Sequence, residues 1–243
     1  MRNFVFLVIA GFLGIYGNAQ DVITGSIPNW ANGSGQVGVM SMGPPEVVGT
    51  FDADGNIEIP LKADALSEIK AQLEASESDS SNGWTASIPT VGERFACGGQ
   101  GAELNLSGSE ELITGLGGAM GFLLVNMEER KRYGYLLIAS SQEFAEGLQP
   151  YKFKPGYALG WYYVDNEASA VGTCTSESYA MNQEDTYRKS TTYQVNLKKG
   201  WNIVKYEIEE VFTDKEGNSY PQKESYTTLE SMPEGVGFVF LED

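Results

Sequence analysis

Two cysteines are the residues of this chain whose types and spacing suggest chemistry most directly. Cys97 and Cys174 are its only cysteines, and in an exported chain an even number of cysteines favours a disulfide. Each lies at the margin of a β-prone stretch, where two Cα atoms can approach to the roughly 5.5 Å that a bridge needs. Two separate buried thiols are the alternative. We predict the bridge, which would stabilise the fold by about 4 kcal/mol in the chain-entropy model.

The chain contains no histidine, which removes the central residue of Ser-His-Asp and Cys-His catalysis and of the usual zinc sites. Carboxylate chemistry remains available, as in glycoside hydrolases that place two acids across a glycosidic bond. The candidate groups are Asp165 with Glu167, and Glu177 with Glu184 and Asp185. With 33 acidic residues in the chain, such neighbours also arise by chance. We therefore predict no catalytic residues and keep a carboxylate-based glycoside hydrolase as an alternative.

Aromatic residues suggest a second kind of chemistry, because a flat aromatic face can stack on a sugar ring. The chain has four tryptophans and 13 tyrosines. Trp30 and Trp84 lie beside Gly- and Ser-rich loops and are the candidate ligand platform. Trp161 and Trp201 lie in β-prone runs and are expected to be core residues. A carbohydrate-binding module is therefore an alternative function.

An Asp-Ala-Asp-Gly-Asn segment at 52–56 has the alternating oxygen side chains that suit calcium. An EF-hand loop needs glycine at its sixth position and glutamate at its twelfth, whereas here Gly55 is fourth and Ala63 is twelfth. The pair Asp54-Gly55 instead favours a tight turn between strands. The segment 214–218 has the same pattern, so we predict two turns, no metal ligands and no cofactor.

The first 19 residues have the layout of a secretory signal peptide. A cation at Arg2 precedes an apolar run over 4–16, and Gly17, Asn18 and Ala19 supply a small-residue cleavage site. The apolar run is 13 residues long, which is short of the roughly 20 that span a bilayer. We therefore expect a mature chain that begins at Gln20 and is secreted or periplasmic.

The charge of the mature chain limits its partners. Without Arg2 it has 15 basic against 33 acidic residues, a net charge of −18. Such a surface repels nucleic acid and anionic lipid headgroups. We expect a protein or glycan partner of unknown identity, no nucleic acid, and no membrane insertion after signal cleavage.

The elements that must position these residues are mostly strands. Leu66, Ile69 and Leu73 recur at helical spacing and predict one short helix near 63–74, followed by a flexible acidic and Ser-rich stretch to residue 83. A helical turn at 110–116 and a long loop at 175–189 are further expectations. The run 191–212 predicts a hairpin with a Lys198-Lys199-Gly200 turn, because its second half alternates with period two. Further strands are predicted at 121–127, 133–140, 156–164, 170–175, 223–229 and 236–241.

An I-x-G-x-I-x-N-W opening at 23–30 and a G-x-F-D-A-D-G-N hairpin at 49–56 carry a resemblance to a known module. They resemble the transthyretin-like, carboxypeptidase-regulatory-like β-module found at the start of many exported bacterial proteins. The later runs 156–174 and 193–204 are similar to uncharacterised secreted bacterial β-sandwich proteins. The resemblance implies an exported β-sandwich without an assigned activity.

Together these observations predict an all-β fold, an antiparallel β-sandwich with a small N-terminal transthyretin-like module and a larger C-terminal β-sandwich. The expected organisation is a signal peptide at 1–19, a small β module at 20–62, a helix and flexible linker at 63–83 and a β-sandwich domain at 84–243. The expected function is that of an exported, non-enzymatic structural or interaction protein of the cell envelope.

Overall fold

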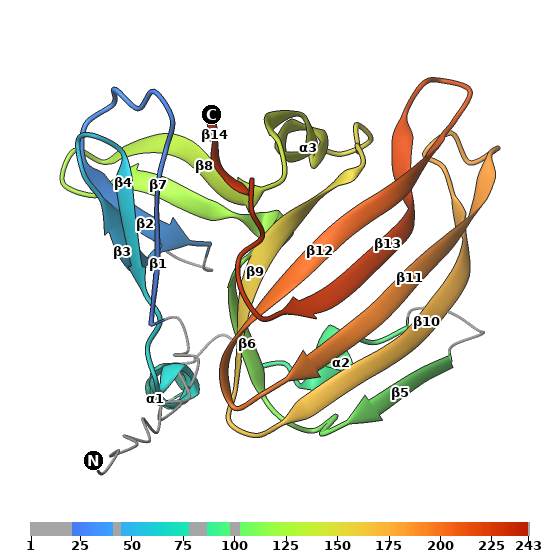
Figure 1. The fold of residues 1–243 in the computed structure, drawn as a ribbon, viewed down its shortest axis with the longest axis horizontal. Helices are drawn as coiled ribbons and strands as arrows, with labels where there is room; N and C mark the ends of the chain where they lie inside the picture. Colours follow the sequence, from blue (N-terminus) through green and yellow to red (C-terminus); the bar gives the residue numbers. More distant parts are fainter. Residues whose placement is uncertain (1–20, 41–44, 78–86, 98–102, 243) are drawn as a thin grey trace, which may run out of the picture.

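A computed structural model of the chain describes residues 21–40, 45–77, 87–97 and 103–242 (Figure 1). The predicted signal peptide, the end of the predicted linker and Trp84 lie outside the described residues. Within the described part the fold is all-β, as predicted, with 14 strands in one sheet. The strands are β1 (Val22–Ser26), β2 (Gly35–Val39), β3 (Glu46–Phe51), β4 (Asn56–Pro60), β5 (Glu103–Ser107), β6 (Ile113–Gly117), β7 (Phe122–Asn126), β8 (Lys131–Ala139), β9 (Gly156–Val164), β10 (Ala168–Tyr179), β11 (Thr186–Leu197), β12 (Gly200–Thr213), β13 (Ser219–Leu229) and β14 (Gly237–Glu242).

The sheet has two halves. Its strand order is β1-β4-β3-β2-β7-β8-β9-β12-β13-β11-β10-β5, with β14 beside β8 and β6 beside β9. The halves meet where β8 and β9 pair through a single residue pair, Ala139 with Ala158. The first half occupies the left of Figure 1 and the second half the right.

The first half closes around an apolar core. Ile23, Val37 and Phe51 from the early strands pack with Phe122 and Leu136 from β7 and β8. Hydrogen bonding of β2 to β7 joins the early strands to strands that follow the helix. A Cβ atom on Gly25 of β1 would lie 2.0 Å from the Phe238 ring of β14. Glycine at this position therefore lets β1 lie directly against β14.

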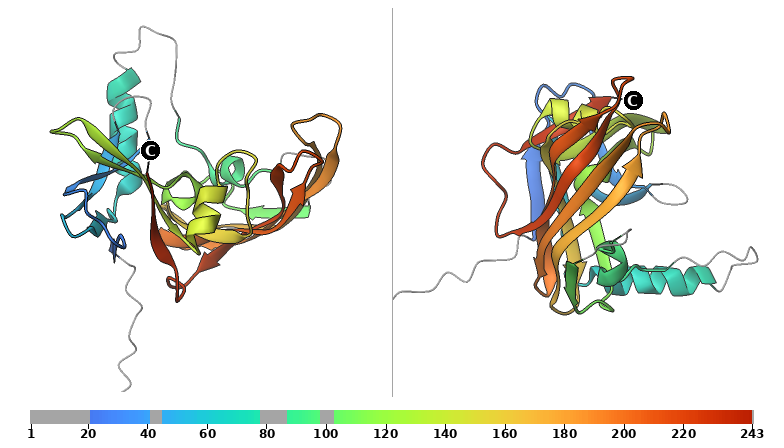
Figure 2. Two further views of the ribbon diagram at one scale, coloured as in Figure 1. Left: turned by 90° about the horizontal axis from the view of Figure 1, so that it is seen from above. Right: turned by 90° about the vertical axis from the view of Figure 1, so that its right-hand side faces the viewer.

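The second half is a curved sheet, and Figure 2 shows its curvature from two sides. Two short helices pack on the inner side of the curve: α2 (Val91–Arg94) and α3 (Gln142–Gly147). Phe95, which follows α2, contacts the rings of Tyr162 and Tyr193. Phe144 of α3 packs in a cluster with Ala158 of β9 and Ile208 of β12.

The predicted short helix near 63–74 is present as α1 (Ala65–Glu77), but the expectation of a single helix is wrong, because α2 and α3 are also present. Helix α1 packs Leu66 against Tyr163, with Trp201 at the edge of the contact.

The predicted helical turn at 110–116 is wrong, because β6 covers most of this stretch and a 3₁₀ turn, η1 (Gly118–Met120), follows it. Among the described residues, no helix is long and apolar enough to cross a membrane.

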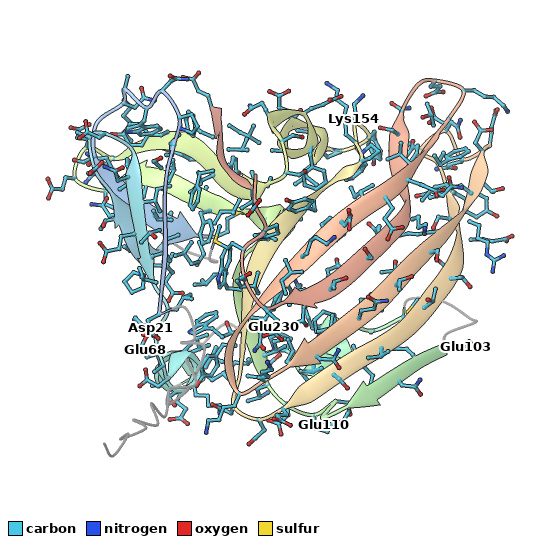
Figure 3. The ribbon with its side chains drawn as sticks, in the orientation of Figure 1. Asp21, Glu68, Glu103, Glu110, Lys154 and Glu230 are labelled. Carbon is cyan, nitrogen blue, oxygen red and sulfur yellow. A yellow bond between two sulfur atoms is a disulfide. The ribbon has the colours of Figure 1, made fainter. Side chains whose placement is uncertain are left out.

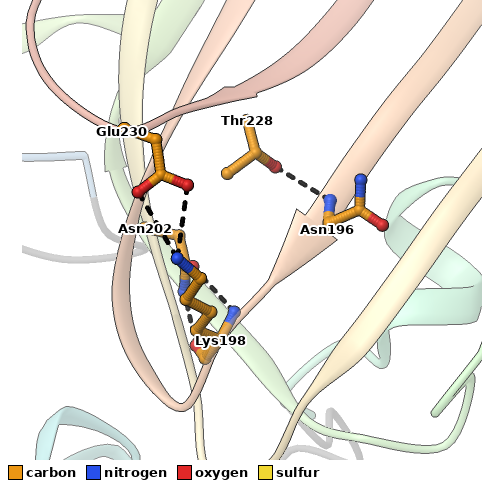
Figure 4. A network of polar contacts seen from close by, with 5 residues as sticks. All are labelled: Asn196, Lys198, Asn202, Thr228 and Glu230. Atoms are coloured by element: carbon orange, nitrogen blue, oxygen red, sulfur yellow. Dashed lines mark hydrogen bonds and ion pairs between the residues drawn. The ribbon is translucent and has the colours of Figure 1, made fainter.

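The predicted hairpin at 191–212 is wrong in its pairing, although both of its strands exist. β13 lies between β11 and β12, antiparallel to β12 and parallel to β11. Figure 4 shows the contacts between Asn202 and Lys198: Asn202 Nδ2 donates to the Lys198 carbonyl (2.7 Å), and the Lys198 N–H donates to Asn202 Oδ1 (2.8 Å). Asn202 Nδ2 also donates to the Gly200 carbonyl at 2.9 Å. On the β13 side, the Asn196 N–H donates to Thr228 Oγ1 at 2.9 Å. The turn therefore connects two strands that are not neighbours in the sheet, because β13 lies between them.

The predicted long loop at 175–189 is also wrong. β10 and β11 pair through most of it, from Ala168 with Leu197 to Tyr179 with Thr186, which leaves only a short turn at the end of the hairpin. These residues are mostly polar, because one face of this end of the hairpin is exposed and the other is only partly buried. Without a fully buried face, the period-2 hydrophobic signal of a strand is absent.

Both Asp-x-x-Gly-Asn segments form turns, as predicted, and they share one geometry. Asp52 accepts from the backbone N–H groups of Asp54 and Asn56 through Oδ1, and from Asn56 Nδ2 through Oδ2. Asp214 accepts in the same way from Glu216 and Asn218. Asp214 also accepts from the Tyr220 hydroxyl at 2.9 Å and is buried, whereas Asp52 is exposed.

The exposure difference makes the two turns a matched pair for a stability test. Burial by itself would raise the pKa of Asp214, but the hydrogen bonds from Asn218, Tyr220 and the Glu216 backbone hold that pKa below 3.8. A lowered pKa contributes stability at pH values above 3.8 that is lost as the pH falls below it. In chemical denaturation at pH 7, Asp214→Ala is expected to destabilise the protein more than Asp52→Ala. At the exposed turn, water can accept the hydrogen bonds that Asp52 accepted, whereas at the buried turn the donors to Asp214 are left without an acceptor. Equal losses would contradict this.

Candidate functional site

The predicted disulfide is present and links Cys97 to Cys174, with Cα atoms 5.5 Å apart. Cys174 lies on β10 opposite Thr191 of β11, and Cys97 follows α2 closely in the chain. The bridge thus ties the segment after α2 to the sheet. It also suggests an oxidising compartment, because such bridges are rare in reducing ones.

Trp30, one of the two predicted platform residues, packs against other rings. Its ring lies edge-on to Phe51 (5.2 Å between centroids), Tyr133 (5.4 Å) and Phe240 (5.1 Å). Its Nε1 donates to the Gly33 carbonyl at 2.6 Å. Trp30 therefore packs against the apolar core of the first half of the sheet, and its side chain is only partly exposed.

Four of the acidic groups considered for hydrolysis, Asp165, Glu167, Glu184 and Asp185, lie between strands, whereas Glu177 lies on β10 opposite Arg188 of β11. Asp165 lies 3.5 Å from Lys70 Nζ and accepts from the Tyr163 hydroxyl at 3.4 Å. Asp185 accepts from Asn182 Nδ2 at 2.8 Å and pairs with Lys215. Neither lines a cavity described below. Other acids are dispersed over separate elements, as Figure 3 shows for Asp21, Glu68, Glu103, Glu110 and Glu230. In the part of the chain that the structure describes, no cluster of three His, Cys, Asp or Glu residues could hold a metal ion.

A cavity of about 510 Å³ with both polar and apolar lining residues lies beside the β11–β12 turn. We call it the Trp201 cavity. It is formed by the end of β11, the start of β12 and the chain that leaves β13. Its polar and aromatic lining includes Asn196, Lys198, Lys199, Trp201, Thr228 and Glu230.

The Asn202 contacts described above hold the floor of the Trp201 cavity in place, while its rim is open. Lys198 Nζ pairs with Glu230 Oε1 at 3.2 Å, and both side chains are largely exposed. Asn196 donates to Thr228 only through its backbone N–H, and Figure 4 shows its side-chain amide without a contact to the neighbouring residues drawn. These groups are therefore accessible to a ligand.

Trp201 supplies an aromatic wall to the cavity. Its Nε1 donates to the Lys62 carbonyl at 2.8 Å, and its ring lies edge-on to Tyr163 at 5.4 Å. The side chain is partly exposed, whereas Trp161, which also lines the cavity, is only 1% exposed. The prediction of a core role therefore describes Trp161 well, while Trp201 has both a packing contact and an accessible surface.

A second polar group of residues, the Glu224 cluster, lies on the inner side of the curved sheet. The Glu224 carboxylate accepts from the Tyr206 hydroxyl at 2.6 Å and from Thr191 at 3.3 Å, and it pairs with Lys189 Nζ at 2.8 Å. Glu224 is only 5% exposed. Burial, together with the nearby Glu224 charge, raises the pKa of Tyr206 well above its ordinary value of 10.0, and that of Tyr226 rises for the same two reasons.

The Glu224 cluster lines a cavity of about 250 Å³ whose wall also contains Cys97 and Cys174. The sequence does not reveal Glu224, because Lys223 precedes it and polar residues surround it, as in an exposed strand. The signal that could have identified it is its place on β13 between two tyrosines, Tyr220 and Tyr226, whose rings need a buried face.

No protein-family model matches this chain, and no curated protein or solved structure matches it significantly.

Proposed function

We propose that this chain is an exported, non-enzymatic interaction protein of the cell envelope, and that the Trp201 cavity is its ligand-binding site. The observation that carries the proposal is the combination, in one cavity of about 510 Å³, of a fixed floor and accessible polar groups. Ligand sites in proteins are concave, largely preformed and equipped with a few placed polar groups. The signal-peptide pattern and the disulfide support export.

The acid content of the cavity supports the non-enzymatic part of the proposal. Glycoside hydrolysis with two carboxylates needs a pair separated by roughly 5 to 9.5 Å. Glu230 is the one carboxylate among the residues that line the Trp201 cavity. Its side chain is solvent-exposed and paired with Lys198, which suits recognition better than proton transfer.

Carbohydrate is the second candidate, as the class of ligand, and Trp201 is the observation that favours it. A partly exposed indole beside amide, ammonium and carboxylate groups offers a sugar both a stacking surface and hydrogen-bond partners for its hydroxyls. The aromatic platform expected from Trp30 and Trp84 is thereby proposed for Trp201 instead.

The two-module sandwich architecture and its transthyretin-like start also remain part of the proposal. The halves of the sheet share a single residue pair at the β8–β9 junction. The second half also has an apolar cluster of its own around Phe95 and Val195, whereas the cluster around Phe51 and Phe122 extends to Trp161 of β9 and Ile203 of β12, where the halves pack together. Both observations support two packed units.

A glycan array followed by titration calorimetry tests the carbohydrate proposal. For a glycan that binds, Asn196→Ala and Lys199→Ala are each expected to weaken affinity about tenfold, since each removes a hydrogen bond of about 1.4 kcal/mol. Gln194→Ala is the matched control, because Gln194 is exposed on β11 like Asn196 but does not line the cavity.

Three results would count against the proposal. An array without hits would remove carbohydrate as the ligand. Equal affinities of the Asn196→Ala and Gln194→Ala variants for a bound glycan would place its site outside the Trp201 cavity. Hydrolysis of a bound glycan that is lost in Glu230→Gln would overturn the non-enzymatic assignment.

A further inference from the structure

A separate cavity of about 310 Å³ lies between the end of β2, strand β6 and helix α2. We call it the Arg94 cavity. It shares no lining residue with the Trp201 cavity, so what it binds does not depend on the function proposed above. Its lining combines one cation with a mainly apolar wall.

Arg94 supplies the cation. It donates to the Tyr162 hydroxyl at 2.5 Å, and its guanidinium carbon lies 5.1 Å from the centre of the Tyr162 ring. Among the described residues, no carboxylate forms an ion pair with Arg94. The adjacent Glu93 accepts from the Thr90 backbone N–H at 2.8 Å in the capping box of α2. In a chain with 33 acidic residues, a fixed arginine without an acidic partner is an unused anion-binding group.

The wall of the Arg94 cavity is apolar and partly exposed. Ile113 and Phe122 are buried in it, whereas Met40 and Met120 at its rim are 62% and 69% exposed. Methionine side chains are flexible and polarisable, so they adapt to ligands of different shape. Two exposed methionines on one cavity indicate a surface that a ligand covers.

Gly115 allows this arrangement. A Cβ atom at Gly115 would lie 2.9 Å from Tyr162 Cδ1. The glycine therefore lets the Tyr162 ring lie close to β6, where its hydroxyl accepts from Arg94. The position of the guanidinium is thus set by the sheet as well as by α2.

We propose that the Arg94 cavity binds a small amphipathic carboxylate, with the carboxylate on the Arg94 guanidinium and a short apolar tail between Met40, Met120 and Leu116. The planar guanidinium presents parallel N–H donors that match a carboxylate. Burial of the tail against the apolar wall removes hydrocarbon surface from water. A fatty acid and an acylated apolar amino acid share this chemistry.

Titration calorimetry of the oxidised protein with octanoate and with N-acetyl-leucine tests the proposal and separates the two sources. At least one of them is expected to bind, and octan-1-ol, which has the same tail as octanoate without its charge, is expected to bind at least about tenfold more weakly. Binding of one compound and not the other assigns the source. Absence of binding by both at millimolar concentration would overturn the proposal.

Variants locate the site and separate binding from folding. Arg94→Gln is expected to weaken carboxylate binding about tenfold or more, and Arg94→Lys to retain part of it. Met120→Glu places a negative charge at an exposed rim position, so it should abolish binding without lowering the melting temperature. Arg188→Gln, at an exposed arginine on β11, is the control and should bind normally. Unchanged affinity for the carboxylate in both Arg94→Gln and Met120→Glu would show that it binds outside the Arg94 cavity and would contradict the proposal.

Discussion

The double variant Cys97→Ser/Cys174→Ser is expected to lose about 4 kcal/mol of unfolding free energy relative to the oxidised protein. The bridge closes a loop between residues 77 apart in the chain, and long loops gain most from closure because the unfolded chain loses most freedom. Urea denaturation of both proteins at pH 7 measures the difference. The loss is large against the 5–15 kcal/mol typical of native domains.

Reduced wild-type protein is the matched control for the two serine substitutions, because it differs from the oxidised protein only in the bond. If reduction and substitution lower stability equally, the bond itself accounts for the loss. A difference below about 1 kcal/mol between oxidised and reduced protein would contradict the expected contribution of the bridge.

Glu224→Ala is expected to cost about 3 kcal/mol of unfolding free energy. The substitution leaves the Tyr206 hydroxyl and the Lys189 ammonium without their acceptor. Unpaired buried donors and charges carry most of such a penalty. The Lys189 side chain is 34% exposed, so water can solvate part of its charge. The expected loss of unfolding free energy is therefore at the lower end of the range for removing one partner of a buried ion pair.

Glu230→Ala provides the comparison for Glu224→Ala. Glu230 also pairs with a lysine, but both side chains of that pair are largely exposed, so its removal should cost less than about 1 kcal/mol. A double-mutant cycle with Lys189→Met isolates the coupling between Glu224 and Lys189. Equal losses for Glu224→Ala and Glu230→Ala would show that the buried cluster contributes no more than a surface pair.

Local features of this protein follow from its sequence. The apolar runs at 121–127 and 133–140 are strands β7 and β8, and the helical spacing of Leu66, Ile69 and Leu73 lies within α1. The Asp-x-x-Gly-Asn segments form turns because the aspartate side chain caps backbone N–H groups within four residues of itself. The pairing of the disulfide was also predictable, because two cysteines allow only one bridge, and the expected export of the chain favoured its formation.

Strand pairing was decided by the tertiary structure. β11 and β12 are joined by a short turn, yet β13 lies between them and pairs in parallel with β11. The period of a strand reports which face is buried, but it does not identify the neighbour that completes its hydrogen bonds. That neighbour depends on contacts between residues far apart in the chain, such as Asn196 with Thr228.

The candidate sites depend on such contacts even more strongly. Glu224 is buried because β11 and β12 bring Lys189 and Tyr206 to it, and Arg94 is fixed by Tyr162, which lies 68 residues away in the chain. By itself the sequence determined the strands with an apolar run or a buried face, the two Asp-x-x-Gly-Asn turns and the one possible disulfide pairing, since these depend on near neighbours or on a single possible partner. Only the tertiary structure decided which polar side chains share a cavity, because burial and charge pairing arise from strands that are distant in sequence and adjacent in space.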